Sequence, residues 1–378
     1  MKILIVSEMS VPYAVGGGEV RYGLLARELA RRGHDVTWLS MRQRQSPAEE
    51  TIDGVRHLHR GPRIHNPPSR PLFAMLRYMF TAFWHVLTHR YDVIDCQTYA
   101  PLPAVWLASV LSRQRMVATI HNVWCGSGTG FLANGIRVAV FTIEAVLYRI
   151  PYRRILTVSE SSAAAIAQRG ACPDRIRVVP NGIVLPPPPP ATADESRVYD
   201  AVFVGRLVGL KRIDHVIECL ARLAGEGILR RAAILGEGPL LETARAQSDA
   251  VGLTDRVEFP GGLPNPRVLE IVRSSRIYLH ASVSEGFPVV MVEAMACGTP
   301  VVAYDIPGVC DVVENGRDGI LVPCRDVEAL AEAAGRLLRD PEARQRMAAA
   351  GREKVEQSLT IDTMTDRVEA VYAEAARR

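Results

Sequence analysis

Short apolar runs alternate along the chain with longer stretches in which apolar residues recur every three or four positions. The first run covers residues 2–7 (KILIVS), and three glycines, Gly16 to Gly18, follow it. Apolar positions with helical spacing come next, at Val20, Leu24, Leu25 and Leu29. Residues 35–40 (DVTWLS) form the next run. Short runs predict buried strands and the longer spacing predicts a helix, so the chain opens as the start of a parallel α/β sheet.

The same alternation continues to the end of the chain. Further strands are predicted at residues 92–96, 116–120, 155–158, 177–179, 201–204, 232–235, 257–259, 276–281 and 300–304. Helices are predicted from about residue 213, over 288–297, within 327–355 and over 362–376. Residues 43–70 are polar and contain Pro and Gly, so we expect them to be irregular. Residues 316–322 are expected to form a hairpin-like edge.

A run of five prolines, residues 186–190, interrupts this pattern and is followed by ATADES. Such a composition is typical of a semi-rigid linker, and 378 residues are too many for one ordinary core. The predicted division is therefore a first domain over 1–184, a linker over 185–196, a second domain over 197–360 and a final helix over 361–378.

The net charge of +4 hides an asymmetry between the two halves. Residues 1–190 carry 22 Lys and Arg against 12 Asp and Glu, whereas residues 191–378 carry 23 against 29. A basic half favours an anionic partner: a membrane surface, a phosphorylated substrate or nucleic acid. Nucleic acid is the weakest of these because the basic residues are spread out without interleaved aromatics. An arginine-rich surface with no partner is the simplest alternative.

Composition and motifs exclude several classes. The seven cysteines are scattered and form no C-x-x-C pair, which favours reduced thiols, a cytoplasmic location and no structural zinc. No apolar run reaches the ~18 residues that span a bilayer, and an acidic residue follows the first apolar run too early for a signal peptide. The chain contains no P-loop, nucleophile elbow, D-x-D pair or H-E-x-x-H motif, so we expect no metal and no cofactor.

Residues 71–89 combine apolar and aromatic side chains with Arg77 and His85. One interpretation is a helix that faces the core. The other is an amphipathic surface that touches lipid or a lipid-linked acceptor, which would place the protein peripherally at the inner membrane face.

The stretch 284–300 (SEGFPVVMVEAMACGTP) carries two glutamates eight residues apart. Glu285 follows a predicted strand, and Pro288 suits the first turn of the next helix. The amides of Gly286 and Phe287 then lie beside a helix N-terminus, which favours anions and hydroxyl oxygens. Glu293 lies about one and a half turns further on and can lean back toward the same place. On spacing alone, a buried βαβ unit with two solvated glutamates explains the stretch equally well.

Two cations flank the loop after the predicted strand at 201–204. Arg206 and Lys211 together suit a diphosphate, since arginine offers a planar fork and lysine a point charge. Lysine is rare in this chain, with 3 against 42 arginines, which makes its presence at 211 more informative. A solvated loop is the alternative.

In the first half, two loops could meet a ligand. Glycines at 16–18 let the backbone approach a ligand at the start of a helix, although a plain flexible loop is equally open. His121 ends the strand at 116–120, where α/β sheets place ligands. It could donate a hydrogen bond to a developing charge, orient a sugar hydroxyl, or be structural.

These motifs together resemble family 4 of the retaining glycosyltransferases, including the glycogen synthases and phosphatidylinositol mannosyltransferases. The matching segments, in order, are MKILIVSE with GGGE, TIHN at 119–122, VSESS at 158–162, VPNGI at 179–183, VGRLVGLKRID at 204–214, LGEGP at 235–239 and SEGFPVVMVEAMACGTPVVA at 284–303. The resemblance implies the GT-B fold, with two Rossmann-like domains whose parallel sheets face across a cleft, and a last helix that crosses back to the first domain.

The resemblance also implies roles for individual residues. Arg206 and Lys211 would neutralise the donor diphosphate, and Glu285 would hold the transferred sugar. Glu293 would bind the nucleotide ribose, and His121 would lie near the donor sugar. Further donor contacts would come from Gly17, Gly18, Gly286, Phe287, Pro288 and Val289. The family often has Asp after the histidine, where this chain has Asn122.

The implied activity is metal-independent transfer of a hexose-type sugar, with retention, from a UDP- or GDP-sugar to an acceptor hydroxyl. The acceptor would be lipid-linked or a small metabolite. Another GT-B enzyme, a disaccharide phosphorylase or a sugar-nucleotide epimerase, is the main alternative. A nicotinamide-dependent dehydrogenase is disfavoured because the G-x-G-x-x-G motif is absent. An inactive binding module is disfavoured because the charged set of Arg206, Lys211, Glu285 and Glu293 is intact.

Overall fold

The computed structural model describes the chain outside residues 14–15, 44, 65–70, 98, 122, 124–133, 189–196 and 378. Asn122 and most of the expected linker thus lie outside the described residues. The chain divides into two compact units. The described residues of 1–125, 132–182 and 361–378 form the first unit, and those of 183–360 form the second.

The first unit is built on an eight-stranded sheet in the order β3-β4-β2-β1-β5-β6-β7-β8. Every pairing is parallel except that between β3 and β4. The strands are β1 (Lys2–Val6), β2 (Asp35–Gln43), β3 (Glu49–Ile52), β4 (Val55–Ile64), β5 (Val93–Gln97), β6 (Met116–Ile120), β7 (Arg154–Thr157) and β8 (Ile176–Val178). The helices are α1 (Gly17–Arg31), α2 (Leu72–Thr88), α3 (Leu102–Leu111), α4 (Asn134–Arg149), α5 (Glu160–Gln168) and α12 (Ile361–Ala376).

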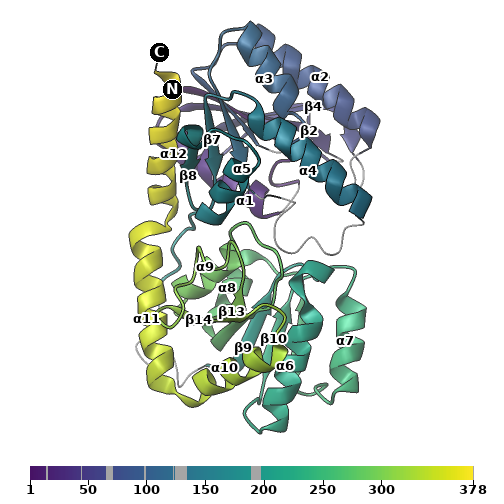
Figure 1. Ribbon diagram of the computed structural model, residues 1–378, viewed down its shortest axis with the longest axis vertical. Coiled ribbons are helices and arrows are strands. Elements are labelled where there is room, and N and C mark those ends of the chain that lie inside the picture. Colours follow the sequence, from purple (N-terminus) through teal and green to yellow (C-terminus); the bar gives the residue numbers. More distant parts are fainter. Residues whose placement is uncertain are drawn as a thin grey trace. The chain divides into compact units, whose positions relative to one another are not determined.

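Both faces of this sheet are covered, which explains why its strands are apolar without alternation. Successive side chains of a strand point to opposite faces, and β1 shows it clearly. Ile3 and Ile5 belong to a core shared with α1 and α12, whereas Leu4 and Val6 belong to one shared with α2 and α3. The C-terminal helix α12, the yellow end of the chain in Figure 1, packs against α1.

The prediction that residues 43–70 are irregular was wrong for the described residues up to 64, and residues 65–70 lie outside the described residues. Strand β2 runs on to Gln43, and β3 and β4 form an antiparallel hairpin. Its turn is Asp53-Gly54, with φ of 50° and 80° at the two residues, a left-handed pair typical of a two-residue hairpin turn. The Asp-Gly pair between β-forming residues was a signal for this hairpin, and the polarity of the segment reflects an edge strand with a solvated face.

The second unit has a six-stranded sheet, entirely parallel, in the order β11-β10-β9-β12-β13-β14. The strands are β9 (Tyr199–Val204), β10 (Ala232–Leu235), β11 (Val257–Gly261), β12 (Ser275–His280), β13 (Val301–Asp305) and β14 (Gly319–Pro323). The helices are α6 (Ile213–Gly225), α7 (Leu241–Ala250), α8 (Asn265–Arg273), α9 (Val289–Ala296), α10 (Val327–Arg339) and α11 (Pro341–Ser358). Figure 1 labels most of these elements.

The structure of this unit corrects one prediction from the sequence and confirms another. Residues 316–322 do not form a hairpin: β14 pairs in parallel with β13, because the connection over residues 306–318 returns the chain to the start of β13 before β14 begins. The strand, helix and strand expected around 284–300 are confirmed as β12, α9 and β13, with Gly298 at φ 68° just past the helix end. The two parallel-sheet α/β units confirm the predicted fold class.

Candidate functional site

In the second unit, the loops after β9, β12 and β13 meet at the carboxyl edge of the sheet, where open α/β sheets bind ligands. Gly308, in the loop after β13, has φ 83°, and a Cβ there would lie 2.5 Å from the backbone oxygen of Glu285. Gly236, after β10, would likewise place a Cβ 1.9 Å from the oxygen of Gly205. Only glycine allows these loops to pack so closely, so the backbone around Glu285 is firmly positioned.

Lys211 and His280 share one carboxylate oxygen of Glu285. Lys211 Nζ lies 2.5 Å from Glu285 Oε1, and His280 Nε2 donates to the same atom at 2.9 Å. The Glu285 side chain is 12% exposed and that of His280 is 1% exposed. Glu285 Oε2 has no hydrogen-bond partner among the residues that the structure describes. One oxygen is therefore anchored by the protein, and the other can accept a hydrogen bond from a ligand.

The charge on this carboxylate is well stabilised. Burial alone would raise the pKa of Glu285, but the Lys211 ammonium and the His280 hydrogen bond outweigh it, and the pKa lies well below its usual value. Burial lowers the pKa of His280, against the opposing effect of Glu285. We conclude that Glu285 is an anion held by Lys211 and by a neutral imidazole.

The backbone after Glu285 leads into α9, for which Pro288 is the N-cap residue. Gly286 is partly exposed, whereas the side chains of Phe287 and Pro288 are buried, and Val289 begins the helix. Helix α9 has a buried, apolar C-terminal half that anchors it in the core. Its N-terminal amides lie beside the Glu285 loop, which suits hydroxyl or anionic oxygens.

Glu293, on α9, does not join the Lys211 cluster. Its Oε1 accepts a hydrogen bond from Asn265 Nδ2 at 2.8 Å. Burial raises the pKa of Glu293, and the bond from Asn265 opposes this only in part. The two glutamates of the 284–300 stretch thus have different environments: Glu285 is charge-paired, and Glu293 is held by an amide at the start of α8.

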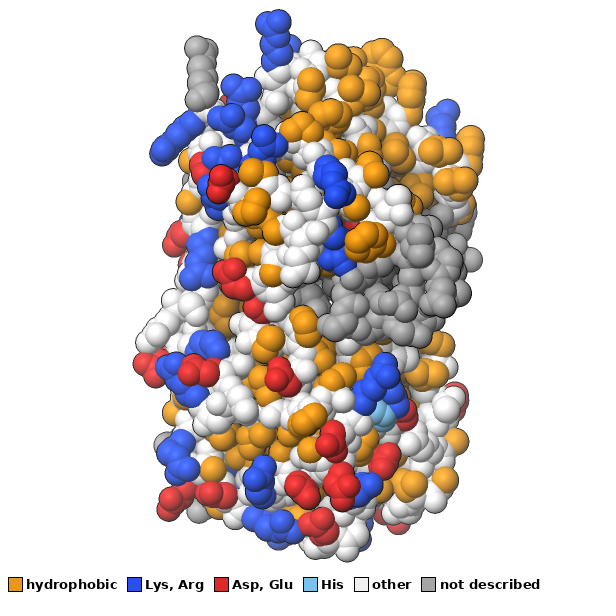
Figure 2. All heavy atoms as spheres, viewed as in Figure 1, with side chains coloured by type: hydrophobic (Ala, Val, Ile, Leu, Met, Phe, Trp, Pro, Cys, Tyr) orange, Lys and Arg blue, Asp and Glu red, His pale blue; other side chains and the backbone are white. Residues whose placement is uncertain are grey.

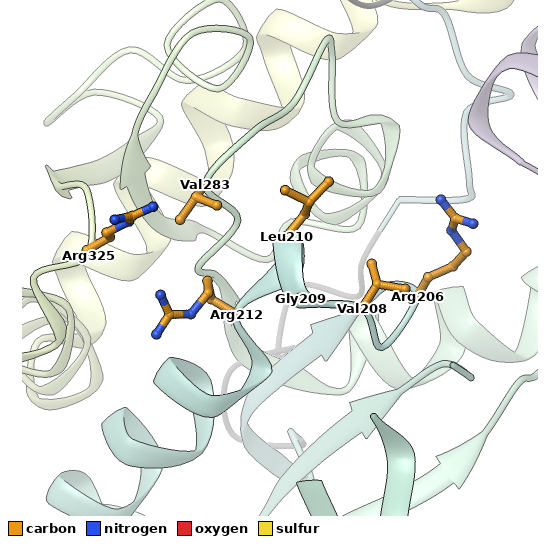
Figure 3. Close-up of a pocket in the computed structure, with 7 residues that line it drawn as sticks. All are labelled: Arg206, Val208, Gly209, Leu210, Arg212, Val283 and Arg325. Atoms are coloured by element: carbon orange, nitrogen blue, oxygen red, sulfur yellow. The ribbon is translucent and has the colours of Figure 1, made fainter. Parts of the chain in front are cut away.

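Arg206 and Lys211 are not equivalent either. Arg206 is exposed and makes no ion pair with a described residue, and it lines a cavity of about 480 Å³. Figure 3 shows Arg206 at one end of this cavity, and Arg212 and Arg325 at the other. Arg212 is paired with Asp214 at 2.6 Å. Arg206 therefore remains available to an anionic ligand, whereas Lys211 is already engaged.

In the first unit, Gly18 and His121 lie next to each other. A Cβ on Gly18 would be 3.7 Å from His121 Cδ2, and Gly16 and Gly17 lie at the N-cap and first position of α1. His121 Nε2 is 3.0 Å from Gln97 Oε1, and Tyr22 makes an edge contact with the imidazole at 5.5 Å between ring centroids. Because the side-chain oxygen of Gln97 can only accept a hydrogen bond, Nε2 of His121 carries the proton. The other ring nitrogen, Nδ1, can then accept a hydrogen bond.

Burial and the charge on Arg21 lower the pKa of His121 to about 3. A histidine whose pKa falls on folding binds its proton only in the unfolded chain between pH 3 and about 6.5. Folding stability is therefore lost as the pH falls through that range.

We expect the free energy of unfolding to drop between pH 7.5 and pH 5, and the drop to be smaller by about 2 kcal/mol in His121→Gln. Urea unfolding of both proteins at the two pH values measures this. An equal drop in the two proteins would show that His121 is not buried in its neutral form.

Three contacts that build these sites were not expected from the sequence: His280 with Glu285, Asn265 with Glu293, and Gln97 with His121. His280 and Gln97 each end a strand, so their position at the carboxyl edge was a usable signal. Asn265 gave none, because its partner is 28 residues away in the sequence.

The described residues include neither a metal-binding cluster nor a helix that could span a membrane. No group of three or more His, Cys, Asp or Glu side chains could hold a metal ion in the part of the chain that the structure describes. Among the same residues, no helix has both the length and the hydropathy required to cross a bilayer.

Comparison with known proteins gives two family matches. Residues 15–185 match the model of "Glycosyltransferase Family 4", and residues 191–354 that of "Glycosyl transferases group 1". The chain is 30% identical to a D-inositol 3-phosphate glycosyltransferase of Acidothermus cellulolyticus, over 86% of this chain and 78% of that protein. It is 28% identical to a glycogen synthase of Mycobacterium tuberculosis, over 100% of this chain and 95% of that protein. A 37% identical match covers 45% of this chain but only 18% of an exopolysaccharide phosphotransferase of Streptomyces coelicolor.

Solved structures show the same fold. Sucrose-phosphate synthase from Thermosynechococcus elongatus matches with a TM-score of 0.85 at 20% identity, over 99% of this chain and 98% of that one. Anabaena Alr3699/HepE in complex with UDP-glucose matches with a TM-score of 0.77 at 19% identity, over 99% of both chains. The chain therefore belongs to the family 4-like glycosyltransferases of the GT-B fold. It is a transferase enzyme.

Proposed function

We propose that this chain is a retaining, metal-independent hexosyltransferase that moves a sugar from a nucleotide-diphosphate sugar to an acceptor hydroxyl. The observation that carries the proposal is the Lys211–Glu285–His280 cluster. Beside the N-terminus of α9, it presents one carboxylate oxygen that no described residue bonds, in a loop whose backbone packs closely on Gly308. An anionic oxygen next to backbone amides can hold two hydroxyls of a sugar in a defined orientation.

Each charged residue has a role in this proposal. Glu285 Oε2 accepts a sugar hydroxyl, and its negative charge stabilises the oxocarbenium-like centre. Arg206, which is exposed and unpaired with any described residue, binds the diphosphate. Lys211 is paired with Glu285 in the free protein, and a donor phosphate would compete with Glu285 for its ammonium. Glu293, kept in place by Asn265, binds the ribose.

In the proposed reaction, the bond between the anomeric carbon and the diphosphate oxygen breaks. The acceptor oxygen then bonds to the same face of that carbon, and its proton passes to the leaving diphosphate. Arg206 and Lys211 offset the charge that develops on the diphosphate, a function that metal ions serve elsewhere. Glu285 is not a nucleophile in this scheme. The place of His121 near the donor sugar remains a prediction from the family resemblance, and its Nδ1 would there accept a hydrogen bond from a hydroxyl.

A UDP- or GDP-sugar is the proposed donor. HepE, which has the same fold, was solved with UDP-glucose, and this supports a uridine nucleotide as the first to test. For the acceptor we propose a lipid-linked or small-molecule hydroxyl. We also propose that the protein works in the cytoplasm, with peripheral contact at the inner membrane face.

The test begins with thermal shift against UDP, GDP and ADP, followed by turnover with the matching glucose, galactose, mannose and N-acetylglucosamine donors. We expect nucleoside diphosphate to be released, faster when an acceptor is present, at a rate unchanged by EDTA. The anomeric configuration of the product, read by NMR, should equal that of the donor. Loss of activity in EDTA or an inverted product would contradict the mechanism.

The same assay separates the alternative enzymes. A disaccharide phosphorylase would need inorganic phosphate and would release no nucleotide. A sugar-nucleotide epimerase would convert the donor into an epimerised sugar nucleotide, without an acceptor and with no net release of the nucleoside diphosphate.

A further inference from the structure

Helix α2 is apolar on two opposite faces. Ala74, Tyr78, Ala82 and Val86, four residues apart, are buried against the sheet. A second set with the same spacing points away from the core: Leu72, Leu76, Phe80 and Trp84, with Phe73 beside them. The interpretation of residues 71–89 as a helix that faces the core is therefore confirmed for one face, and the opposite face is an exposed apolar surface.

Helix α3 extends this second face. Gln114, just past the end of α3, donates to the backbone oxygen of Val86 at 2.6 Å, and Arg90 donates to that of Ser112. The C-terminal ends of α2 and α3 are thus held side by side. We call the exposed set the outer apolar face, and it consists of Leu72, Phe73, Leu76, Phe80, Trp84, Leu107, Val110 and Leu111. Figure 2 shows hydrophobic side chains gathered over this part of the molecule.

These eight side chains are between 46% and 70% exposed. Single exposed apolar residues are ordinary on protein surfaces, but a contiguous group marks an interaction site. The core does not need these side chains, since the other face of each helix already packs on the sheet. A partner is needed to explain them.

The charges around the face indicate an anionic partner. Residues 72–113, which include both helices, contain three arginines and two acidic residues. Of those two, Asp95 is fully buried, and Asp92 accepts from the backbone amide of Lys2. Arg77 lies within the outer apolar face, and the exposed Arg90 and Arg113 lie at its edge.

The same charges disfavour a second copy of this chain. A two-fold contact of the face with itself would bury Arg77 of both copies, and neither α2 nor α3 contains an Asp or Glu to pair with it. Burying an unpaired cation is costly. A bilayer instead offers acyl chains to the aromatic and aliphatic groups and anionic headgroups to the arginines, with Trp84 suited to the boundary.

We propose that the outer apolar face of α2 and α3 binds the surface of a membrane that contains anionic lipids. This refines the peripheral location proposed above by naming the surface and the lipid charge. It does not depend on the transfer reaction, because membrane binding is measured without donor or acceptor. A failed transfer assay would therefore not contradict membrane binding, and a failed binding assay would not contradict the transfer reaction.

The experiment is co-sedimentation of the full chain with vesicles of phosphatidylcholine alone, or of equal parts phosphatidylcholine and phosphatidylglycerol. We expect at least tenfold stronger partition to the phosphatidylglycerol vesicles, weakened by salt. Leu76→Ser/Phe80→Ser should lower the partition coefficient by at least about tenfold, and Arg77→Gln by about fivefold. Trp84 fluorescence should be quenched by brominated lipid.

Matched controls come from exposed residues of the second unit. Val198→Ser/Val251→Ser removes two exposed apolar side chains, and Arg336→Gln removes an exposed arginine of α10. Both should bind vesicles like the parent. Equal partition to the two vesicle types, or full binding by the Leu76→Ser/Phe80→Ser variant with an unchanged melting curve, would overturn the proposal. So would dimerisation in ultracentrifugation that this double variant abolishes, since a second copy would then cover the face.

Discussion

Replacing Glu285 with glutamine is expected to lower kcat by about a thousandfold while the protein stays folded. Glutamine keeps the shape of the side chain, and its oxygen can still accept the hydrogen bonds from Lys211 and His280. What it loses is the negative charge that would stabilise the oxocarbenium-like centre. We therefore expect the loss mainly in kcat, with the affinity for the nucleotide diphosphate almost unchanged.

The measurement is turnover of the donor identified by thermal shift, with circular dichroism to check the fold. Glu242→Gln, an exposed carboxylate at the start of α7, is the matched control and should keep full activity. Glu285→Ala should be as inactive as Glu285→Gln. Near-normal turnover in either Glu285 variant, with the fold intact, would show that this carboxylate does not act on the transferred sugar.

Replacing Lys211 with methionine is expected to reduce both transfer and stability. Transfer should fall at least a hundredfold, because the leaving diphosphate loses a cation (about 2.7 kcal/mol). Stability should fall by about 2 kcal/mol, because Glu285 stays buried without its charge partner. The two effects have one cause, the removal of a cation that serves the carboxylate in the free enzyme and, by our proposal, the donor in the complex.

The pH dependence follows from the lowered pKa of Glu285. A carboxylate whose pKa falls on folding contributes stability above its unfolded pKa of about 4.3, and this is lost as the pH drops toward the folded value. The stability difference between the parent and Lys211→Met should therefore be largest at neutral pH and shrink below about pH 4. Urea unfolding at pH 7.5 and pH 3.5 measures it.

Two further variants separate the structural effect from the catalytic one. Lys354→Met removes a comparable ion pair, in which Lys354 Nζ lies 2.9 Å from Oδ2 of the buried Asp318. This variant should lower stability without affecting transfer. Lys211→Met/Glu285→Gln should recover part of the stability lost in Lys211→Met, since no buried charge remains unpaired, but no activity. If the double variant were less stable than Lys211→Met, the ion pair would not be the source of the effect.

Local patterns were sufficient for most of the strands and several of the helices along the chain, because strands buried on both faces appear as short apolar runs and the helices between them keep the helical period. They failed at residues 43–64, where the hairpin of β3 and β4 lies at a sheet edge. An edge strand is half solvated, so its sequence resembles a loop, and only the Asp53-Gly54 turn indicated the strands on either side.

The sequence by itself determined the α/β class, the two sheets, and the charged residues Arg206, Lys211 and Glu285 at loops that follow strands. Only the tertiary structure decided that Lys211 and His280 share one oxygen of Glu285, that Glu293 pairs with Asn265, and that α2 keeps a second apolar face exposed. The physical reason is that periodicity records which side of an element is apolar, whereas contacts between loops 28 or 74 residues apart depend on how the strands are ordered in the sheet.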